Sequence, residues 1–266
     1  MHKFKPAFGL KNRHLQTIYS SFFRKNKNLD IEIETFSLSD GDFLEAYWFN
    51  KPKKNSTIPI VVIFHGLEGS FSSPYINGIM YSLNKAGLSC VLMHFRSCSG
   101  KINLKAKSYH SGETKDAKEF IESLNKRFVS NDLFAIGYSI GGNMLLKLLG
   151  ECGKQTPLKA AISICAPLDL AICADKISLG FASFYEKKFL KTLKKTLLLK
   201  YEQHDMKSLI FFEKEEVENI VRQQIERILV DADVVPREEF EIVKSMAAKA
   251  RRKQEEMEMR IQQLEK

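Results

Sequence analysis

A serine between two glycines is the feature of this sequence that points most directly to chemistry. Ser139 stands in the segment Gly137-Tyr138-Ser139-Ile140-Gly141, between an apolar stretch typical of a strand and one typical of a helix. A G-x-S-x-G turn in that setting is tight and strained, and it raises the serine hydroxyl above the edge of a sheet. The N-terminus of the following helix then presents free N–H groups to developing negative charge. The pattern predicts that Ser139 is a nucleophile.

A second motif, HGLEG at residues 65–69, follows the apolar run 58–64. Loops of this type supply one backbone N–H group to an oxyanion, and the residue after the nucleophile supplies the other. We therefore expect the N–H groups of Leu67 and Ile140 to bind the oxyanion. The N–H group of Glu68 is the alternative to that of Leu67.

A general base for the serine is harder to find. His65 belongs to the oxyanion loop, on the wrong side of the serine for a base, and we expect it to shape that loop. His204 is the only histidine after Ser139, and it falls in a helical segment. His110 precedes the serine, and a structural role is favoured for it. We therefore expect no histidine within hydrogen-bonding reach of Ser139.

An acid to orient such a base is equally uncertain. The candidates are the aspartates after the serine: Asp169, Asp175, Asp205, Asp231 and Asp233. Asp169 is a weak acid candidate because it follows an expected strand. Capping of the helix that begins at Leu170 is the favoured alternative for its carboxylate.

The elements that must position these residues follow from hydrophobic periodicity. The expected strands are 31–49 (two strands around a turn at 39–42), 58–64, 88–95, 133–137 and 160–165, and the expected helices are 75–85, 113–128 and 140–149. Strands alternating with helices predict an α/β fold with a parallel sheet. Right-handed crossovers then place the loops after the strands along one edge, where ligands bind.

Residues 175–200 break this rhythm, because apolar residues at helical spacing are interleaved with lysines. One interpretation is a basic amphipathic surface that contacts anionic lipid. The favoured interpretation is a helix that covers the active-site edge, with its apolar side down and its lysines in water.

Several segments in order resemble the YheT-like branch of the α/β-hydrolases. They are FKPAFGLKNRHLQT, FHGLEGS, HFRSCSGKIN, SYHSGETKDA, GYSIGGN and CAPLDLAICAD, and the resemblance runs from about residue 4 to about residue 215. It implies a serine hydrolase acting on carboxylic esters, with Ser139 as nucleophile. It does not imply a particular substrate.

The sequence also departs from this family in one respect. In that family the acid and the base follow two later strands, and no such strands are recognisable in this sequence. We therefore expect residues 1–212 to form an incomplete α/β-hydrolase parallel sheet with lid-like helices. A serine-protease triad that loses members keeps only about 10³–10⁴-fold acceleration over water, so we expect an impaired enzyme.

Residues 213–266 differ in composition, with no glycine and many charges. Apolar residues alternate by three and four from 240 to 264, interrupted by Gln254, which predicts a helical coiled-coil segment. Residues 219–266 resemble the UbiK-like accessory factors of ubiquinone biosynthesis, also described as membrane-fusogenic coiled coils. That resemblance implies a homo-oligomer through residues 240–264 and transient contact with a membrane surface. An alternative function is therefore a non-catalytic accessory or interaction protein linked to ubiquinone biosynthesis.

Other classes of function find little support. The sequence contains no metal-ligand spacing, no dinucleotide or phosphate loop and no nucleic-acid-binding motif, so we expect no cofactor, no metal and no nucleic acid. The odd number of cysteines, without a CxxC motif, favours reduced thiols and a cytoplasmic location. The expected small-molecule partner is an ester substrate.

Overall fold

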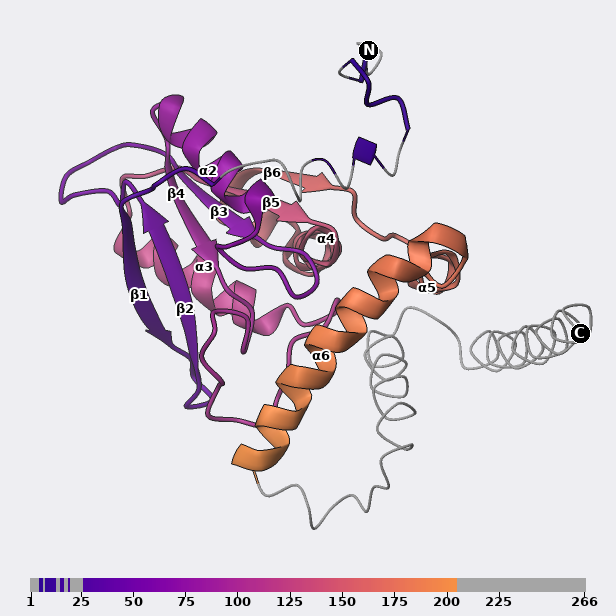
Figure 1. Ribbon diagram of the computed structural model, residues 1–266. Helices are drawn as coiled ribbons and strands as arrows, with labels where there is room; N and C mark the ends of the chain where they lie inside the picture. The colour runs from indigo at the N-terminus through magenta and orange to yellow at the C-terminus, as the bar shows by residue number, and fades with distance from the viewer. Residues whose placement is uncertain (1–4, 7, 13–14, 17–18, 20–25, 205–266) are drawn as a thin grey trace, which may run out of the picture.

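The computed structural model describes residues 5–6, 8–12, 15–16, 19 and 26–204 (Figure 1). Its centre is a six-stranded sheet with the order β1-β2-β4-β3-β5-β6. The strands are β1 (Ile31–Ser37), β2 (Phe43–Phe49), β3 (Ile60–Phe64), β4 (Ser89–Met93), β5 (Leu133–Tyr138) and β6 (Leu158–Ile164). The domain boundary expected at residue 212, and the coiled coil expected beyond it, lie outside the described residues.

The sheet is mixed, and its larger part is the expected parallel sheet. Strands β4, β3, β5 and β6 run parallel to one another. Strands β1 and β2 form an antiparallel hairpin, and β2 joins the sheet antiparallel to β4, with Trp48 opposite Val91. A short turn can join only antiparallel strands, so the predicted turn at 39–42 already required this arrangement.

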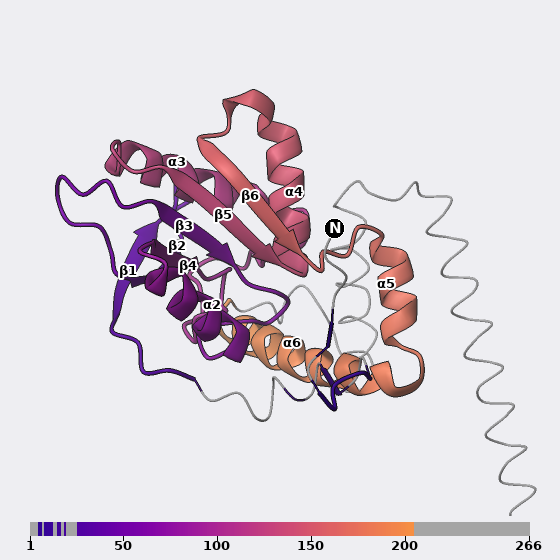
Figure 2. The same cartoon turned by 90° about the horizontal axis from the view of Figure 1, so that it is seen from above.

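Helices cover both faces of the sheet (Figure 2). They are α2 (Pro74–Lys85), α3 (Lys115–Arg127) and α4 (Ile140–Cys152), followed by α5 (Leu170–Ile177), α6 (Ser183–Gln203) and the short 3-10 turns η1 (Gly153–Gln155) and η2 (Gly180–Ala182). Helix α2 packs on one face with Val61 and Ile63, and helices α3 and α4 pack on the other with Val62 and Phe64. Strand β3 is therefore buried on both faces, as its continuous apolar run predicts.

The helix expected at 175–200 is divided in two. Gly180 has a φ of 56°, a left-handed conformation that glycine adopts without steric cost, and the chain turns there between α5 and α6. Over the described residues, no helix combines the length and the apolarity needed to cross a bilayer.

Helix α6 is fastened to the loops that follow β3 and β4. Lys200 is buried, and its Nζ donates to the carbonyl of Lys107 at 2.5 Å and to the hydroxyl of Ser108 at 3.3 Å. The side chain of Gln203 donates to the carbonyl of Asn103 at 3.1 Å. The helix therefore covers the edge of the sheet where the strands end, as its favoured interpretation predicted.

Candidate functional site

Ser139 lies at the turn between β5 and α4, as the sequence predicts. Its φ is 51° and its ψ is −120°, a strained conformation for a residue with a side chain. Its N–H donates to the carbonyl of Ile164 on the neighbouring strand at 2.8 Å, and its carbonyl accepts from Asn143 at 3.0 Å. These bonds hold the backbone in place, while the residue itself is exposed.

The glycine before the turn is required by close packing. A β-carbon at Gly137 would lie 2.5 Å from the carbonyl oxygen of Gly141 and 2.6 Å from the α-carbon of Gly142. Both are backbone atoms of α4 and cannot move aside cheaply. The first turn of the helix therefore sits directly against the end of β5, which fixes where the Ser139 side chain begins.

The HGLEG loop lies close to the serine. A β-carbon at Gly66 would lie 3.3 Å from the β-carbon of Ser139 and 3.5 Å from the Tyr75 hydroxyl. The side chains of Leu67 and Ile140 both pack against the same hydrophobic core. The two backbone segments expected to bind an oxyanion are therefore adjacent and rigidly supported.

The hydrogen bonds of this loop distinguish between its two candidate oxyanion donors, the N–H groups of Leu67 and Glu68. The Gly66 N–H donates to the Tyr75 hydroxyl at 2.9 Å, and the Glu68 N–H donates to the Tyr109 hydroxyl at 2.8 Å. Within the described part of the chain, the N–H groups of Leu67 and Ile140 have no acceptor. Leu67 is therefore better suited than Glu68 to bind an incoming oxygen, as the sequence analysis favoured.

Two buried histidines support the loop. The Nε2 atom of His65 accepts from the Phe95 N–H at 3.0 Å, and its Nδ1 lies 2.7 Å from the Gly66 carbonyl. His94 likewise accepts from the Phe71 N–H at 3.2 Å and lies 3.1 Å from the Glu45 carbonyl. Burial lowers the pKa of His65 to about 3 and that of His94 to about 4. Both rings are neutral at pH 7, each with Nδ1 protonated, and His65 shapes the loop as expected.

The remaining described histidines are held elsewhere. His110 Nδ1 accepts from the Gly112 N–H at 3.1 Å. The His204 N–H donates to the Lys200 carbonyl at 3.0 Å at the end of α6. None of the histidines among the described residues is hydrogen-bonded to Ser139. The expectation that no histidine base lies within reach of this serine stays a prediction.

Asp169 caps helix α5. Its carboxylate accepts from the Ile172 N–H at 2.9 Å, and the residue is exposed. The capping alternative therefore accounts for its contacts. Asp175 lies within α5, and Asp205, Asp231 and Asp233 lie outside the described residues.

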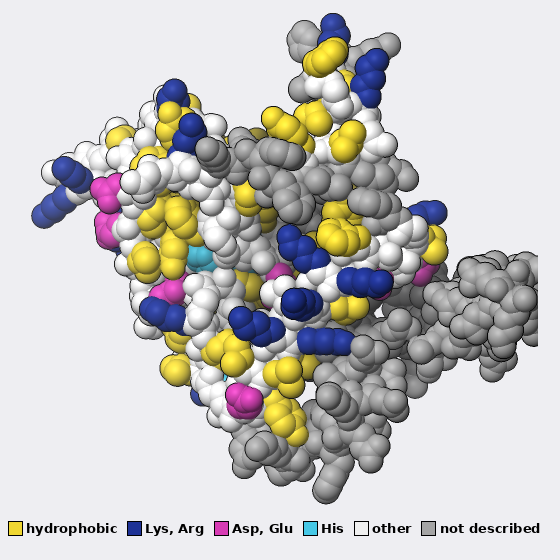
Figure 3. Space-filling model, viewed as in Figure 1, with side chains coloured by type: hydrophobic (Ala, Val, Ile, Leu, Met, Phe, Trp, Pro, Cys, Tyr) yellow, Lys and Arg dark blue, Asp and Glu magenta, His cyan; other side chains and the backbone are white. Residues whose placement is uncertain are grey.

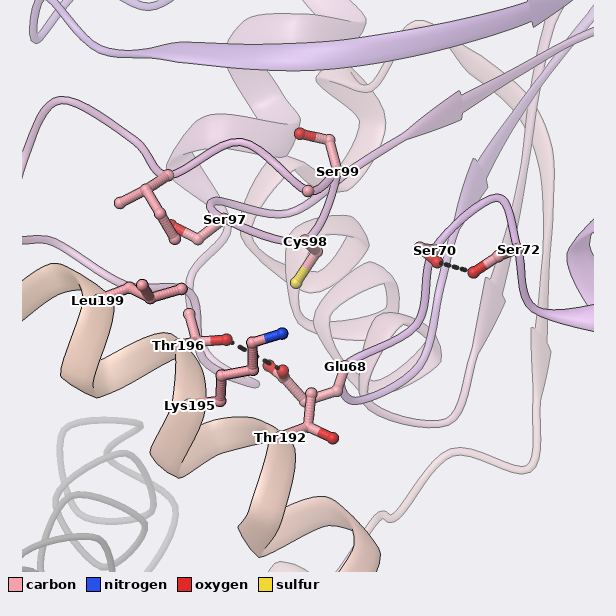
Figure 4. Close-up of a pocket in the computed structure, with 12 residues that line it drawn as sticks. Glu68, Ser70, Ser72, Ser97, Cys98, Ser99, Thr192, Lys195, Thr196 and Leu199 are labelled. Atoms are coloured by element: carbon pink, nitrogen blue, oxygen red, sulfur yellow. Dashed lines mark hydrogen bonds between the residues drawn. The ribbon is translucent and has the colours of Figure 1, made fainter.

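A polar pocket of about 370 Å³ lies beside the loop, under α6 (Figure 4). Glu68 and Thr196 meet across it, with the threonine hydroxyl 3.5 Å from Oε2. The other carboxylate oxygen accepts from the Tyr109 hydroxyl at 2.8 Å. Burial raises the pKa of Glu68, and these two hydrogen bonds partly offset the rise. The Cys98 thiol also faces the pocket, and burial raises its pKa.

Sequence reasoning missed the residues that brace the site from a distance, namely Tyr75, His94, Tyr109 and Thr196. Tyr109 and His94 lie in the SYHSGETKDA and HFRSCSGKIN segments, so the ordered motifs were a usable signal for them. Nothing in the local pattern marks Tyr75 or Thr196.

A family model described as the alpha/beta hydrolase fold matches residues 59–214, more than half of the chain. The chain belongs to the α/β-hydrolase fold family. A second model, described as membrane fusogenic activity, matches residues 205–266. This α/β-hydrolase chain therefore has two parts, as the two resemblances indicated.

Relatives of this α/β-hydrolase are found in bacteria and eukaryotes. YheT of Escherichia coli is 40% identical over 192 residues, covering 72% of this chain and 56% of that protein. The medium-chain fatty acid ethyl ester synthase/esterase 2 of Saccharomyces cerevisiae is 34% identical over 122 residues, 46% of this chain and 27% of that one. The Pyrococcus furiosus esterase Pf2001 has a TM-score of 0.48 at 17% identity, covering 62% of this chain and 65% of that chain. The chain spans about half the length, or less, of the curated relatives that it matches.

Proposed function

We propose that this protein is a serine hydrolase acting on carboxylic esters, with Ser139 as its nucleophile. The observation that carries the proposal is the close approach of the strained Ser139 turn to a loop whose Leu67 N–H is unoccupied. Ester chemistry is supported by the yeast relative named as an esterase and by the human relative named phospholipase ABHD3, which is 26% identical over 167 residues.

The proposed reaction begins with attack of the Ser139 hydroxyl oxygen on the ester carbonyl carbon. The N–H groups of Leu67 and Ile140 stabilise the oxyanion of the tetrahedral intermediate, in the place where charge develops. The alcohol then leaves, and an acyl group remains on Ser139. The hydroxyl proton goes to water, because none of the described histidines is bonded to the serine.

This arrangement favours formation of the acyl-enzyme (acylation) over its hydrolysis (deacylation). In acylation by an activated ester, such as a p-nitrophenyl ester, water slowly takes the Ser139 proton and the leaving group needs no acid. Deacylation must expel the serine oxygen, a much poorer leaving group that needs a proton from an acid, and its attacking water needs a base. We therefore expect the acyl-enzyme to accumulate.

The test is p-nitrophenol release from p-nitrophenyl butyrate at high protein concentration. We expect slow release of about one equivalent, followed by a much slower rate, and no such phase in Ser139→Ala. Release that is identical in the wild type and Ser139→Ala would contradict the assignment of the nucleophile.

A second function is supported by the match of residues 205–266 to the membrane-fusogenic family. We propose that the heptad pattern from 240 to 264 drives self-association of the full chain. Met257→Asp with Ile261→Asp would place charges in the apolar seam and dissociate it, because an unpaired buried charge is costly. Light scattering on the full chain is the measurement, with Gln254→Asp, at the polar position of the same seam, as the milder comparison. A monomer in both the wild type and the double variant would exclude a coiled-coil role and its associated accessory function.

A further inference from the structure

The outer face of α6 carries a row of lysines over its middle turns. Eight of the exposed residues of this helix recur at intervals of three and four and so lie on one face: Phe184, Lys187, Lys188, Lys191, Lys195, Leu198, Leu199 and Glu202. Of these, Lys195 and Leu199 also line the pocket under α6. We call this set the outer face of α6. The opposite face carries Thr196 and Lys200, whose side chains are bonded to the loops beneath.

The lysines of the outer face are not in ion pairs with acidic side chains of the described part of the chain. Among the described residues, Lys187, Lys188, Lys191 and Lys195 form no ion pair. Glu186, in the first turn, accepts a hydrogen bond from Ser178 at 2.9 Å. The face carries four lysines and one acidic residue, Glu202, so its net positive charge attracts anions. Figure 3 shows these dark blue side chains gathered along the diagonal course of α6.

Large apolar side chains stand among the lysines. Phe184 is 55% exposed, Leu198 is 50% exposed and Leu199 is 41% exposed. Figure 3 shows yellow side chains between the blue ones along this helix. Phe184 contacts the Tyr185 ring and Leu199 lines the pocket, and the exposed part of each of these side chains would be buried favourably wherever an apolar phase is offered.

Charge and apolarity together select one kind of partner. A nucleic acid or another polyanion would pair with the lysines and leave Phe184 and Leu198 in water. A bilayer surface uses both, because lysine head groups reach the phosphates while aromatic and leucine side chains enter the acyl boundary. An anionic leaflet adds electrostatic attraction for each lysine near it.

We propose that the outer face of α6 docks on a bilayer surface rich in anionic phospholipid. Helix α6 also touches the oxyanion loop through Thr196 and Glu68. Docking therefore brings the edge of the sheet that holds Ser139 close to the lipid surface. The proposal concerns α6 itself and does not depend on the hydrolase activity or on residues 205–266.

Vesicle flotation of the full chain tests this directly. We expect binding to vesicles of phosphatidylcholine mixed with phosphatidylglycerol, weakening as salt is raised, and little binding to phosphatidylcholine alone. The triple variant Lys187→Glu, Lys188→Glu and Lys191→Glu should bind at least about tenfold more weakly. The substituted positions lie in the interior of α6, where glutamate and lysine have similar helix propensities, so α6 should still form. Circular dichroism and the Tm check that it does.

A matched control carries the same change in charge elsewhere. Lys54, Lys115 and Lys126 are exposed and lie outside α6. Their replacement by glutamate should reduce binding by much less than the α6 triple variant does. Equal losses in the two triple variants would overturn the proposal, because they would indicate a response to net charge alone.

A separate variant tests the contribution of the apolar side chains on the outer face of α6. Phe184→Ser with Leu198→Ser keeps every lysine, and we expect at least about fivefold weaker vesicle binding. The lipid proposal would be overturned if this variant bound vesicles as well as the wild type does and the wild type bound duplex DNA as tightly as it binds vesicles. Those two results would identify a site for polyanions in general. Binding that is unchanged in every α6 variant would assign vesicle contact to other residues, and it would also overturn the proposal.

Discussion

A β-carbon placed on Gly66 would lie 3.3 Å from the β-carbon of Ser139, so the two loops that form the candidate site are close neighbours with no room for a side chain at residue 66. This closeness depends on packing on the far side of each loop. Gly66 is tied to the Tyr75 hydroxyl, and Ser139 is tied to β6 through Ile164. The geometry around the serine therefore depends on strands and helices that are remote in sequence.

Gly137→Ala should destabilise the protein. The added methyl group would meet the backbone of Gly141 and Gly142, and overpacking of this kind costs about 1–3 kcal/mol. Gly150→Ala is the matched control, because Gly150 lies in α4 with open space where a β-carbon would go. That variant should gain about 0.5–1 kcal/mol from helix propensity. Urea denaturation of both measures the effect, and equal stabilities would refute the close packing at Gly137.

The free energy of unfolding should fall as the pH drops below 6.5. Burial lowers the pKa of His65 to about 3 and that of His94 to about 4, while the unfolded chain takes up these protons near pH 6.5. The stabilising contribution is complete above pH 6.5 and is lost as the pH falls toward those lowered values. Each histidine contributes a slope of up to about 1.4 kcal/mol per pH unit.

His94→Gln separates this effect from general acid sensitivity. The variant has one fewer buried imidazole, so its stability should depend less steeply on pH between about 6 and about 5. Urea denaturation at several pH values in this window gives the slopes. Identical slopes in the variant and the wild type would show that His94 is protonated equally easily in the folded and unfolded chains.

Lys200 should make the protein more stable in mild alkali. Burial lowers its pKa from 10.5 to about 8. Between these values the unfolded chain holds a proton that the folded chain has lost, so stability rises with pH there. Lys200→Met keeps the apolar stem and should lack this rise, whereas Lys191→Met, at an exposed position, should retain it. Thermal unfolding at pH 7.5 and pH 9.5 makes the comparison, and a rise of the same size in Lys200→Met would exclude Lys200 as its source.

Removal of the Arg96 side chain should be severely destabilising. Arg96 is buried and donates to Asp40, Asp42 and Asp116 at 2.6–2.8 Å. Arg96→Met would leave the buried Asp42 carboxylate without a counter-ion, while Asp116 keeps only Lys107, at a cost of about 3–5 kcal/mol. Lys118→Met, which removes an exposed pair with Glu122, should cost less than about 1 kcal/mol. A small loss for Arg96→Met in urea denaturation would show that water or rearrangement satisfies these aspartates.

Local pattern was enough to predict the Ser139 turn, the HGLEG loop and most strands, because each depends on neighbouring residues. The sequence pattern did not predict the break between α5 and α6 at Gly180, because the helical spacing of apolar residues continues across it. The break depends on the positive φ of this one glycine. The choice between Leu67 and Glu68 as donor also needed the structure, because it depends on the hydroxyl of Tyr109, which is remote in sequence.

Covalent labelling by a fluorophosphonate, followed by peptide mapping, tests the assignment of Ser139 most directly. Fluoride leaves without help from an acid, so slow attack by Ser139 gives the adduct when water takes the serine proton and the two backbone donors stabilise the phosphoryl oxygen. We expect a single adduct on the peptide that contains Ser139, absent from Ser139→Ala and from protein unfolded in urea. No adduct after long incubation, or an adduct that persists in Ser139→Ala, would contradict the proposal that Ser139 is the nucleophile.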